Sequence, residues 1–120
     1  MPAIFHSDKS FVTPYPGVQR MIVADREDGS GAISMLIGIV EPGGAILPHT
    51  HPVEEAFTIL EGDARVLVGE ETFEVRGGGA TFVAPGNTVH GLRNIGTTPV
   101  KIVGAYPSVN VTATRVDREI

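Results

Sequence analysis

The sequence contains no cysteine, and this absence narrows the chemistry that the protein can perform. Disulfides, thiolate catalysis, iron–sulfur ligation and a thiolate-bound structural zinc are all excluded. Any bound metal must therefore be held by imidazole and carboxylate groups. Nothing in the composition requires an oxidising compartment.

Long hydrophobic runs and clusters of positive charge are also missing. The first residues lack the basic start and the apolar stretch of a signal peptide, and no later segment approaches membrane-spanning length. The formal net charge is −5 and the pI is about 5.2. These features argue against binding to nucleic acid or to membranes, and they predict a soluble, cytoplasmic protein whose partner is a small, largely uncharged organic ligand.

A helical hydrophobic stripe is absent as well. Fifteen glycines and nine prolines divide the 120 residues into short runs that are rich in Val, Ile, Thr and Phe and often alternate in polarity. This profile predicts an all-β barrel or sandwich, and the length fits one domain that buries roughly two-thirds of its unfolded surface. The expected strands cover residues 18–24, 32–40, 55–60, 64–68, 72–75, 80–83, 88–93 and 100–106.

The chain shows no low-complexity linker and no internal repeat, so residues 1–120 are interpreted as one domain. Residues 1–17 are expected to form an irregular N-terminal arm, residues 18–106 the barrel, and residues 107–120 a tail. Within the tail, residues 109–116 alternate like a strand. They are expected to add an edge strand to the barrel or to pair with a second subunit, and either arrangement would cover an exposed edge.

Three histidines and one glutamate have a spacing that predicts a metal site. His49 and His51 lie two apart, so on an extended strand they project from the same face, and Glu55 keeps that parity. The turn at residues 85–87 delivers His90 on a new strand, where an antiparallel neighbour brings it opposite the first pair. Three imidazoles and a carboxylate suit a divalent Fe, Mn, Zn, Ni or Cu ion, and they leave one or two coordination positions open if the metal is six-coordinate.

Other polar residues near these blocks have simpler interpretations. Glu54 has the opposite parity and is expected to face solvent, and His6 lies in the irregular arm as a solvated histidine. Arg65 and Arg93 are expected on the outside, because an unpaired guanidinium in an apolar barrel is costly. Asn94 is interpreted as a structural hydrogen-bonding residue at the end of its strand.

The two blocks resemble the signature motifs of the cupin superfamily, specifically its small single-domain members. In that family the first motif runs Gly, five residues, His-x-His, three or four residues, Glu, six residues, Gly. The second runs Gly, five residues, Pro-x-Gly, two residues, His, three residues, Asn. The matching positions here are Gly43, His49, His51, Glu55 and Gly62 in the first motif and Gly79, Pro85, His90 and Asn94 in the second.

Two positions depart from the family pattern. Asn87 stands where the family usually has glycine, and asparagine tolerates the left-handed backbone that such a turn needs. Ala80 stands where members of the family often carry an acidic residue. This difference is expected to affect the turn more than the metal. The resemblance implies a jelly-roll β-barrel of six to eight strands, commonly a homodimer, with the metal bound inside near one mouth.

The alternation of strand residues also predicts the walls of a ligand pocket. Side chains that share the inward parity of Glu55 and His90 are expected to surround the metal with mostly apolar surface. The predicted substrate-binding residues are Leu47, Phe57, Ile59, Thr88 and Leu92.

Two classes of function follow from this site. The first is a metal-dependent enzyme of dioxygenase-like type, with Glu55 as metal ligand and as the catalytic proton acceptor. The resemblance also admits isomerases, cyclases, decarboxylases and lyases that use the metal as a Lewis acid. The second class is a sensor or carrier that binds a small molecule without turning it over. In favour of this second class, no general acid or base beyond the ligands is identified in the pocket.

Overall fold

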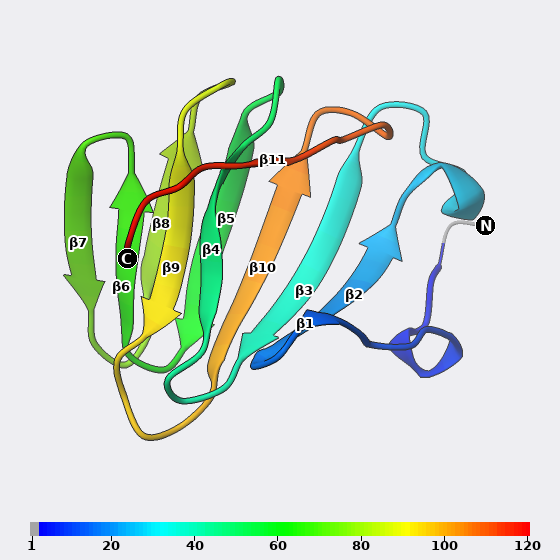
Figure 1. The fold of residues 1–120 in the computed structure, drawn as a ribbon. Coiled ribbons are helices and arrows are strands. Elements are labelled where there is room, and N and C mark those ends of the chain that lie inside the picture. The colour runs from blue at the N-terminus through cyan, green and yellow to red at the C-terminus, as the bar shows by residue number, and fades with distance from the viewer. Residues whose placement is uncertain (1–2) are drawn as a thin grey trace.

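The computed structural model describes residues 3–120 and shows two antiparallel sheets stacked face to face as a jelly-roll barrel (Figure 1). One sheet has six strands in the order β1-β2-β3-β10-β5-β8, and the other has five in the order β11-β4-β9-β6-β7. The strands are β1 (Val12–Tyr15), β2 (Val18–Ala24), β3 (Ser34–Val40), β4 (Ala45–Thr50), β5 (Glu55–Glu61), β6 (Ala64–Val68), β7 (Glu71–Val75), β8 (Ala80–Ala84), β9 (His90–Asn94), β10 (Val100–Tyr106) and β11 (Thr114–Arg115).

The all-β prediction is confirmed over the described residues. Their only helical segments are two short 3-10 turns, η1 (His6–Asp8) and η2 (Arg26–Asp28). No helix among residues 3–120 has the length and apolarity needed to cross a membrane.

The core lies between the two sheets and extends from beside the histidines toward the other end of the barrel. Inward positions alternate along each strand, so Val40, Ile59 and Val100 from one sheet meet Val66 and Leu92 from the other. Each of these side chains is at most 2% exposed. Burying one such side chain contributes about 1.5–3 kcal/mol, so apolar burial stabilises the fold.

The N-terminal arm differs from the prediction, whereas the C-terminal tail adds a short edge strand, which is one of its two predicted arrangements. Residues 1–17 were expected to be irregular, but residues 12–15 form the edge strand β1, which pairs with β2. Pro14 is tolerated there because an edge strand needs only one of its two hydrogen-bonding sides. In the tail only Thr114–Arg115 is a strand, and it pairs with β4 of the same chain.

Two strand positions bring distant segments of the chain together at the site. β4 lies beside β9 in the five-stranded sheet, with His49 opposite His90. β5 begins with Glu55 in the six-stranded sheet, which faces it. In Figure 1 the tail crosses over this end of the barrel in front of β4 and β10.

Candidate metal centre

The four predicted metal ligands form one cluster in the structure. His49 lies on β4, His51 follows it directly, His90 begins β9 and Glu55 begins β5. One ligand atom from each residue lies within 4.8 Å of all the others. The ring centroids of His49 and His90 are 4.4 Å apart, and those of His51 and His90 are 4.7 Å apart. The cluster therefore joins three imidazoles from one sheet to a carboxylate from the other.

Backbone carbonyl groups orient all three imidazole rings. Nδ1 of His49 lies 2.8 Å from the carbonyl oxygen of Leu47, and Nδ1 of His51 lies 2.7 Å from that of Val53. Nδ1 of His90 lies 2.9 Å from the carbonyl oxygen of Thr88. A carbonyl oxygen can only accept, so each Nδ1 donates its hydrogen. The lone pair of a neutral ring is then on Nε2, the atom that is left to bind a metal.

The donor set fits a cation at its centre. Oε1 of Glu55 lies 3.3 Å from Nε2 of His51 and 3.0 Å from Nε2 of His90. All three of these residues are at most 5% exposed. If both rings are neutral, their lone pairs face a carboxylate oxygen at close range, so a proton or a metal ion must lie among them. Two imidazole nitrogens and a carboxylate oxygen around one point are typical of transition-metal sites.

Burial and mutual contacts shift the pKa values of the ligands in different directions. Burial lowers the pKa of His49. Burial also acts to lower the pKa of His51, but its hydrogen bonds with Glu55 and the Val53 carbonyl outweigh that effect, and the pKa is raised. Burial acts to raise the pKa of Glu55, but contacts with His51 and His90 outweigh it and lower the pKa. The carboxylate is thus held in its charged form.

A cavity of about 370 Å³ opens beside the cluster and contains all four predicted ligands. Of the five predicted pocket residues, Leu47, Phe57 and Leu92 line it. Their aliphatic and aromatic surfaces make this part of the wall apolar. Their role in binding a substrate remains a prediction.

The other two predicted pocket residues do not line this cavity, and the prediction was wrong for them. Ile59 keeps the inward parity, but it lies deeper along β5, is fully buried, and belongs to the core. Thr88 precedes β9 in a turn, where strand alternation does not apply, and its methyl group points toward Gly69. Thr88 contributes only its carbonyl oxygen, which orients His90.

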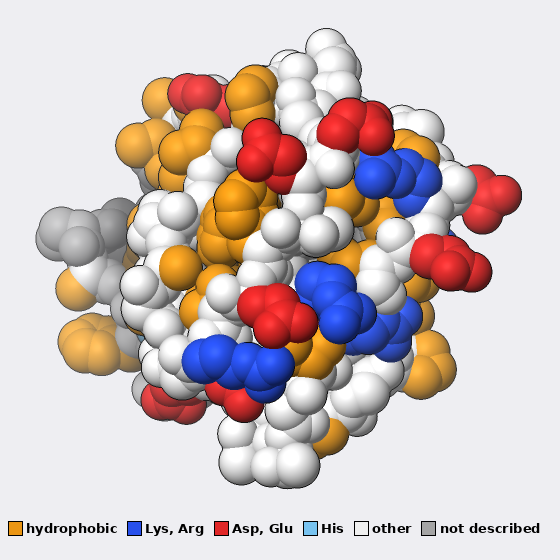
Figure 2. Space-filling view, turned by 90° about the vertical axis from the view of Figure 1, so that its left-hand side faces the viewer, with side chains coloured by type: hydrophobic (Ala, Val, Ile, Leu, Met, Phe, Trp, Pro, Cys, Tyr) orange, Lys and Arg blue, Asp and Glu red, His pale blue; other side chains and the backbone are white. Residues whose placement is uncertain are grey.

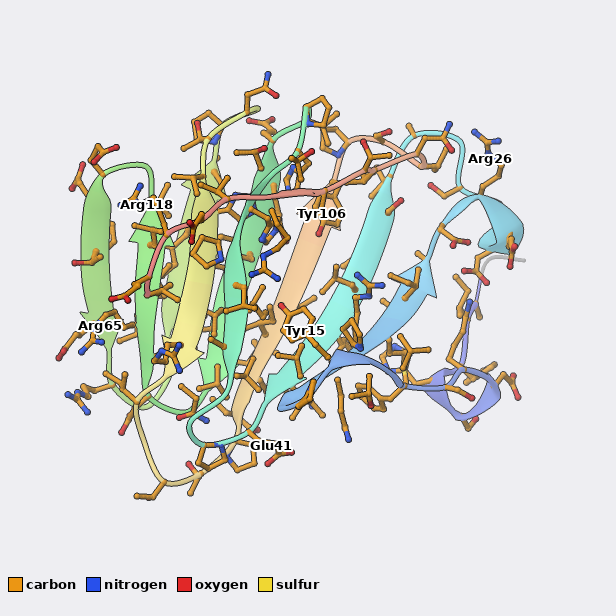
Figure 3. The ribbon with its side chains drawn as sticks, in the orientation of Figure 1. Tyr15, Arg26, Glu41, Arg65, Tyr106 and Arg118 are labelled. Atoms are coloured by element: carbon orange, nitrogen blue, oxygen red, sulfur yellow. The ribbon has the colours of Figure 1, made fainter. Side chains whose placement is uncertain are left out.

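The cavity also holds polar side chains that the sequence prediction missed. Tyr15 and Tyr106 both extend into the space between the sheets (Figure 3). The Tyr106 ring is edge-on to His51 at a centroid distance of 5.0 Å. Burial, followed by the negative charge of Glu55, raises the pKa of Tyr106, so its phenol stays protonated. The additional polar residues of the lining are Gln19, Arg20, Asp25, Ser34 and Arg115.

Strand alternation could have revealed some of these residues. Arg20 lies between Val18 and Ile22 on β2 and shares their inward parity. Tyr106 is two residues beyond Gly104 on β10, on the same face. Arg115 could not have been found in this way, because its place depends on the path of the tail across the barrel mouth.

The simpler interpretations of the surrounding polar residues hold. Asn94 is 2% exposed; its amide donates to the carbonyl oxygens of Val40 and Thr98, and its side-chain oxygen accepts from Gly96. His6 and Glu54 are exposed. Asn94 is therefore a structural residue.

Arg65 and Arg93 also lie outside the cavity, as predicted. Arg65 is near Glu74, and Arg93 donates to the carbonyl oxygens of Gly43 and Ile120. Figure 2 shows acidic and basic side chains interspersed on this end of the molecule.

Two curated proteins match part of the chain. It is 40% identical over 65 residues to mannose-1-phosphate guanylyltransferase RfbM of Salmonella typhimurium, which is 53% of this chain and 13% of that protein. It is 38% identical over 76 residues to an uncharacterised protein of Methanocaldococcus jannaschii, which is 62% of this chain and 60% of that protein. The chain thus matches less than two-thirds of the length of either relative.

Solved structures share the fold over most of the chain. The polyketide cyclase RemF from Streptomyces resistomycificus aligns with a TM-score of 0.82 at 21% identity, covering 99% of this chain and 87% of that one. Oxalate oxidase in complex with the substrate analogue glycolate aligns at 0.76 and 27% identity, covering 91% and 60%. The oxalate decarboxylase of Bacillus subtilis, a protein with Mn(II) centres, aligns with a TM-score of 0.80 at 23% identity, covering 92% of this chain and 30% of that one.

The family model described as Cupin domain matches residues 36–106, which is more than half of the chain. The matched segment contains both histidine motifs and runs from β3 to β10. Fold, ligand cluster and family model agree, and the chain belongs to the cupin family.

Proposed function

We propose that the protein is a metal-dependent enzyme that acts on a small organic molecule, with dioxygenase-like oxidation as the reaction. The observation that carries this proposal is the ligand cluster beside the cavity. Three imidazoles are oriented by carbonyl groups, so that Nε2 is free in each, and Glu55 approaches from the opposite sheet. A cavity of about 370 Å³ gives room for an organic ligand next to them.

The residues that would hold the metal are His49, His51, Glu55 and His90. Nitrogen and oxygen donors of this kind suit Mn(II) and Fe(II) as well as Zn(II), Ni(II) and Cu(II). When bound, the metal polarises a ligand oxygen, and Fe or Mn also supports reactions with dioxygen. The similarity to an oxalate decarboxylase with Mn(II) centres makes manganese the first metal to test.

The side chains of this protein supply the remaining functions of the site. Glu55 is the candidate proton acceptor, because its charged carboxylate lines the cavity. Leu47, Phe57 and Leu92 exclude water from one side of the ligand. Tyr106 offers a protonated phenol that can donate a hydrogen bond to a ligand oxygen.

One observation favours a second candidate, a Lewis-acid isomerase, cyclase or lyase. Such reactions need proton transfer at the substrate, and the cavity contains both a carboxylate and a phenol, from Glu55 and Tyr106. Oxidation with dioxygen at the metal depends less on a side chain that donates or accepts a proton. The two candidates use the same metal ligands and differ in whether oxygen is consumed.

Elemental analysis of the untagged protein, purified without added metal or chelator, tests the proposal first. We expect about one metal ion per chain in the wild type and a large loss in His90→Ala. The matched control is His6→Ala, which removes an exposed histidine outside the cluster. Failure of the wild type to bind any metal after reconstitution would contradict the proposal.

A ligand screen under air then separates the functional classes. Catechols and β-diketones are tested for thermal stabilisation, oxygen uptake and product formation with the metal-loaded protein. Oxygen uptake with product supports the dioxygenase-like reaction, and product without oxygen uptake supports the second candidate. Stabilisation without any product identifies a non-catalytic binding protein.

A further inference from the structure

The charged side chains of the cavity lining balance one another, and a bound metal would make the cavity positive, although the chain as a whole has a net charge of −5. Its lining contains two arginines, Arg20 and Arg115, and two carboxylates, Asp25 and Glu55. With a divalent metal bound, four positive charges oppose two negative ones. A site of this sign attracts anions and concentrates them near the metal.

The two arginines reach the cavity from opposite sheets. Arg20 is an exposed residue of β2 that lines the cavity, with the parity of Val18 and Ile22. Arg115 lies on β11 opposite His49, and paired residues of antiparallel strands share a face. The guanidinium groups therefore flank the same cavity that contains the metal ligands.

Neither guanidinium has a protein partner among residues 3–120. Arg65, Arg76 and Arg118 each lie within 4.0 Å of a carboxylate, whereas Arg20 and Arg115 form no ion pair and no side-chain hydrogen bond there. The other nearby acid, Asp25, accepts a hydrogen bond from the Glu27 backbone as the cap of η2. The hydrogen-bonding capacity of both guanidiniums is thus available to a ligand.

We propose that the substrate is a small organic acid, with an oxygen donor at the metal and a carboxylate that Arg20 and Arg115 bind. This inference rests on the metal-dependent function proposed above and replaces the expectation of a largely uncharged ligand. Guanidinium groups bind carboxylates through paired, charge-assisted hydrogen bonds. The apolar side chains between the two ends, such as Phe57 and Leu92, then contact the carbon skeleton.

Calorimetric titration of the Mn(II)-loaded protein with two β-diketones tests the inference. Acetylacetone offers only the two metal-binding oxygens, and succinylacetone has the same diketone with a carboxylate at the end of two methylene groups. We expect succinylacetone to bind on the order of tenfold more tightly, because charge-assisted hydrogen bonds add to metal coordination. The advantage should shrink as salt is added.

Variants identify the residues responsible. Arg20→Gln and Arg115→Gln should reduce the advantage of succinylacetone and leave acetylacetone binding unchanged. Arg26→Gln, an exposed arginine outside the cavity lining, is the matched control and should behave as the wild type.

A titration with Mn(II) alone separates failure of this inference from failure of the proposed function. If the metal does not bind, the proposed function is wrong. If the metal binds but succinylacetone has no advantage, if neither diketone binds, or if the arginine variants have no effect, the substrate class is wrong.

Discussion

At the scale of single residues, the metal site depends on short-range contacts with the backbone. Each imidazole hydrogen-bonds to a carbonyl oxygen two residues away, so the ring is oriented by the strand or turn that carries it. This arrangement selects the tautomer in which Nε2 is free for the metal. Local chain geometry therefore accounts for the orientation of the ligands, and only their convergence needs the tertiary fold.

The pKa shifts predict how metal binding depends on pH. Imidazole must be neutral to bind a metal, so protons and metal compete. Because the pKa of His51 is raised, protons begin to compete with the metal for His51 at a pH above the ordinary histidine pKa of 6.5. Because the pKa of His49 is lowered, protons compete for His49 only at lower pH. We expect the affinity for Mn(II) to fall by about tenfold per pH unit once His51 protonates.

Calorimetric titration in mildly acidic and mildly alkaline buffers measures this dependence. His6→Ala should show the same profile as the wild type, because His6 is outside the cluster. An affinity that is constant through neutral pH would contradict the assignment of His51 as a ligand.

Gly104 controls the position of the Glu55 carboxylate. A Cβ atom at this position would lie 2.6 Å from Oε2 of Glu55, which is closer than van der Waals contact allows. We expect Gly104→Ala to turn the carboxylate away and to lower the metal affinity by roughly 10–100-fold, as for loss of a group that positions a ligand. Metal titration and urea unfolding measure affinity and stability separately.

The matched control for this variant is Gly31→Ala. No atom lies within 4 Å of a Cβ built at Gly31, so its metal affinity should be unchanged. An unchanged affinity in Gly104→Ala would show that Glu55 is free to move or is not a ligand.

At the scale of elements, turns and strand pairing deliver the ligands to one place. The turn from Pro85 to Asn87 directs the chain into β9, and the backbone N–H of Asn87 donates to the His51 carbonyl oxygen at 2.8 Å. This hydrogen bond links the two histidine motifs directly. Asn87 has a φ of 61°, the only positive φ of a non-glycine residue among residues 3–120.

Substitution of Asn87 tests the conformational demand of this turn. Ala in the left-handed region costs about 1–2 kcal/mol, so Asn87→Ala should be destabilised by roughly 1 kcal/mol. Asn87→Gly should be as stable as the wild type or slightly more stable, because glycine adopts this conformation without steric cost. Urea unfolding measures both, and equal loss of stability in the two variants would indicate that the asparagine side chain itself is needed.

At the scale of the whole molecule, the core adjoins the metal site and extends beyond it: Phe57 and Leu92 belong to the core and line the cavity, whereas Val40, Ile59 and Val66 do not line it. The largest fully buried side chains, such as Ile59 and Leu67, are apolar, and the polar cluster lies at one end of the barrel. We therefore expect the chain to fold without metal. Metal binding should add stability by mass action rather than create the structure.

The double variant His49→Ala/His51→Ala tests this expectation. We expect metal binding to be lost while the β-sheet signal in circular dichroism persists. In the wild type, metal at a hundred times its dissociation constant should add about 2.7 kcal/mol to the free energy of unfolding, and in the variant none. Global unfolding of the variant would show instead that the metal is structural.

The sequence was sufficient to predict the β-fold, the cupin family and the four residues that cluster as candidate metal ligands. Most strand positions followed from alternation and from glycine-rich turns, which are local properties, but β1 and β4, the strand that carries His49, were not among the expected strands. His49, His51 and Glu55 lie two and four residues apart, so they share the same strand parity, and His90 follows a recognisable turn. The cytoplasmic location, the metal and the reaction remain predictions, because no local pattern determines them.

Only the tertiary structure decided the contents of the cavity. Arg20, Tyr106 and Arg115 come from segments far apart in sequence and meet because two sheets stack and the tail crosses the mouth. Ile59 was wrongly placed in the pocket, because alternation gives the face of a strand but not the depth at which the two sheets close together. The face of the strand on which a residue lies is a local property that repeats every two residues. The depth of that residue in the barrel and the side chains that surround it depend on long-range packing.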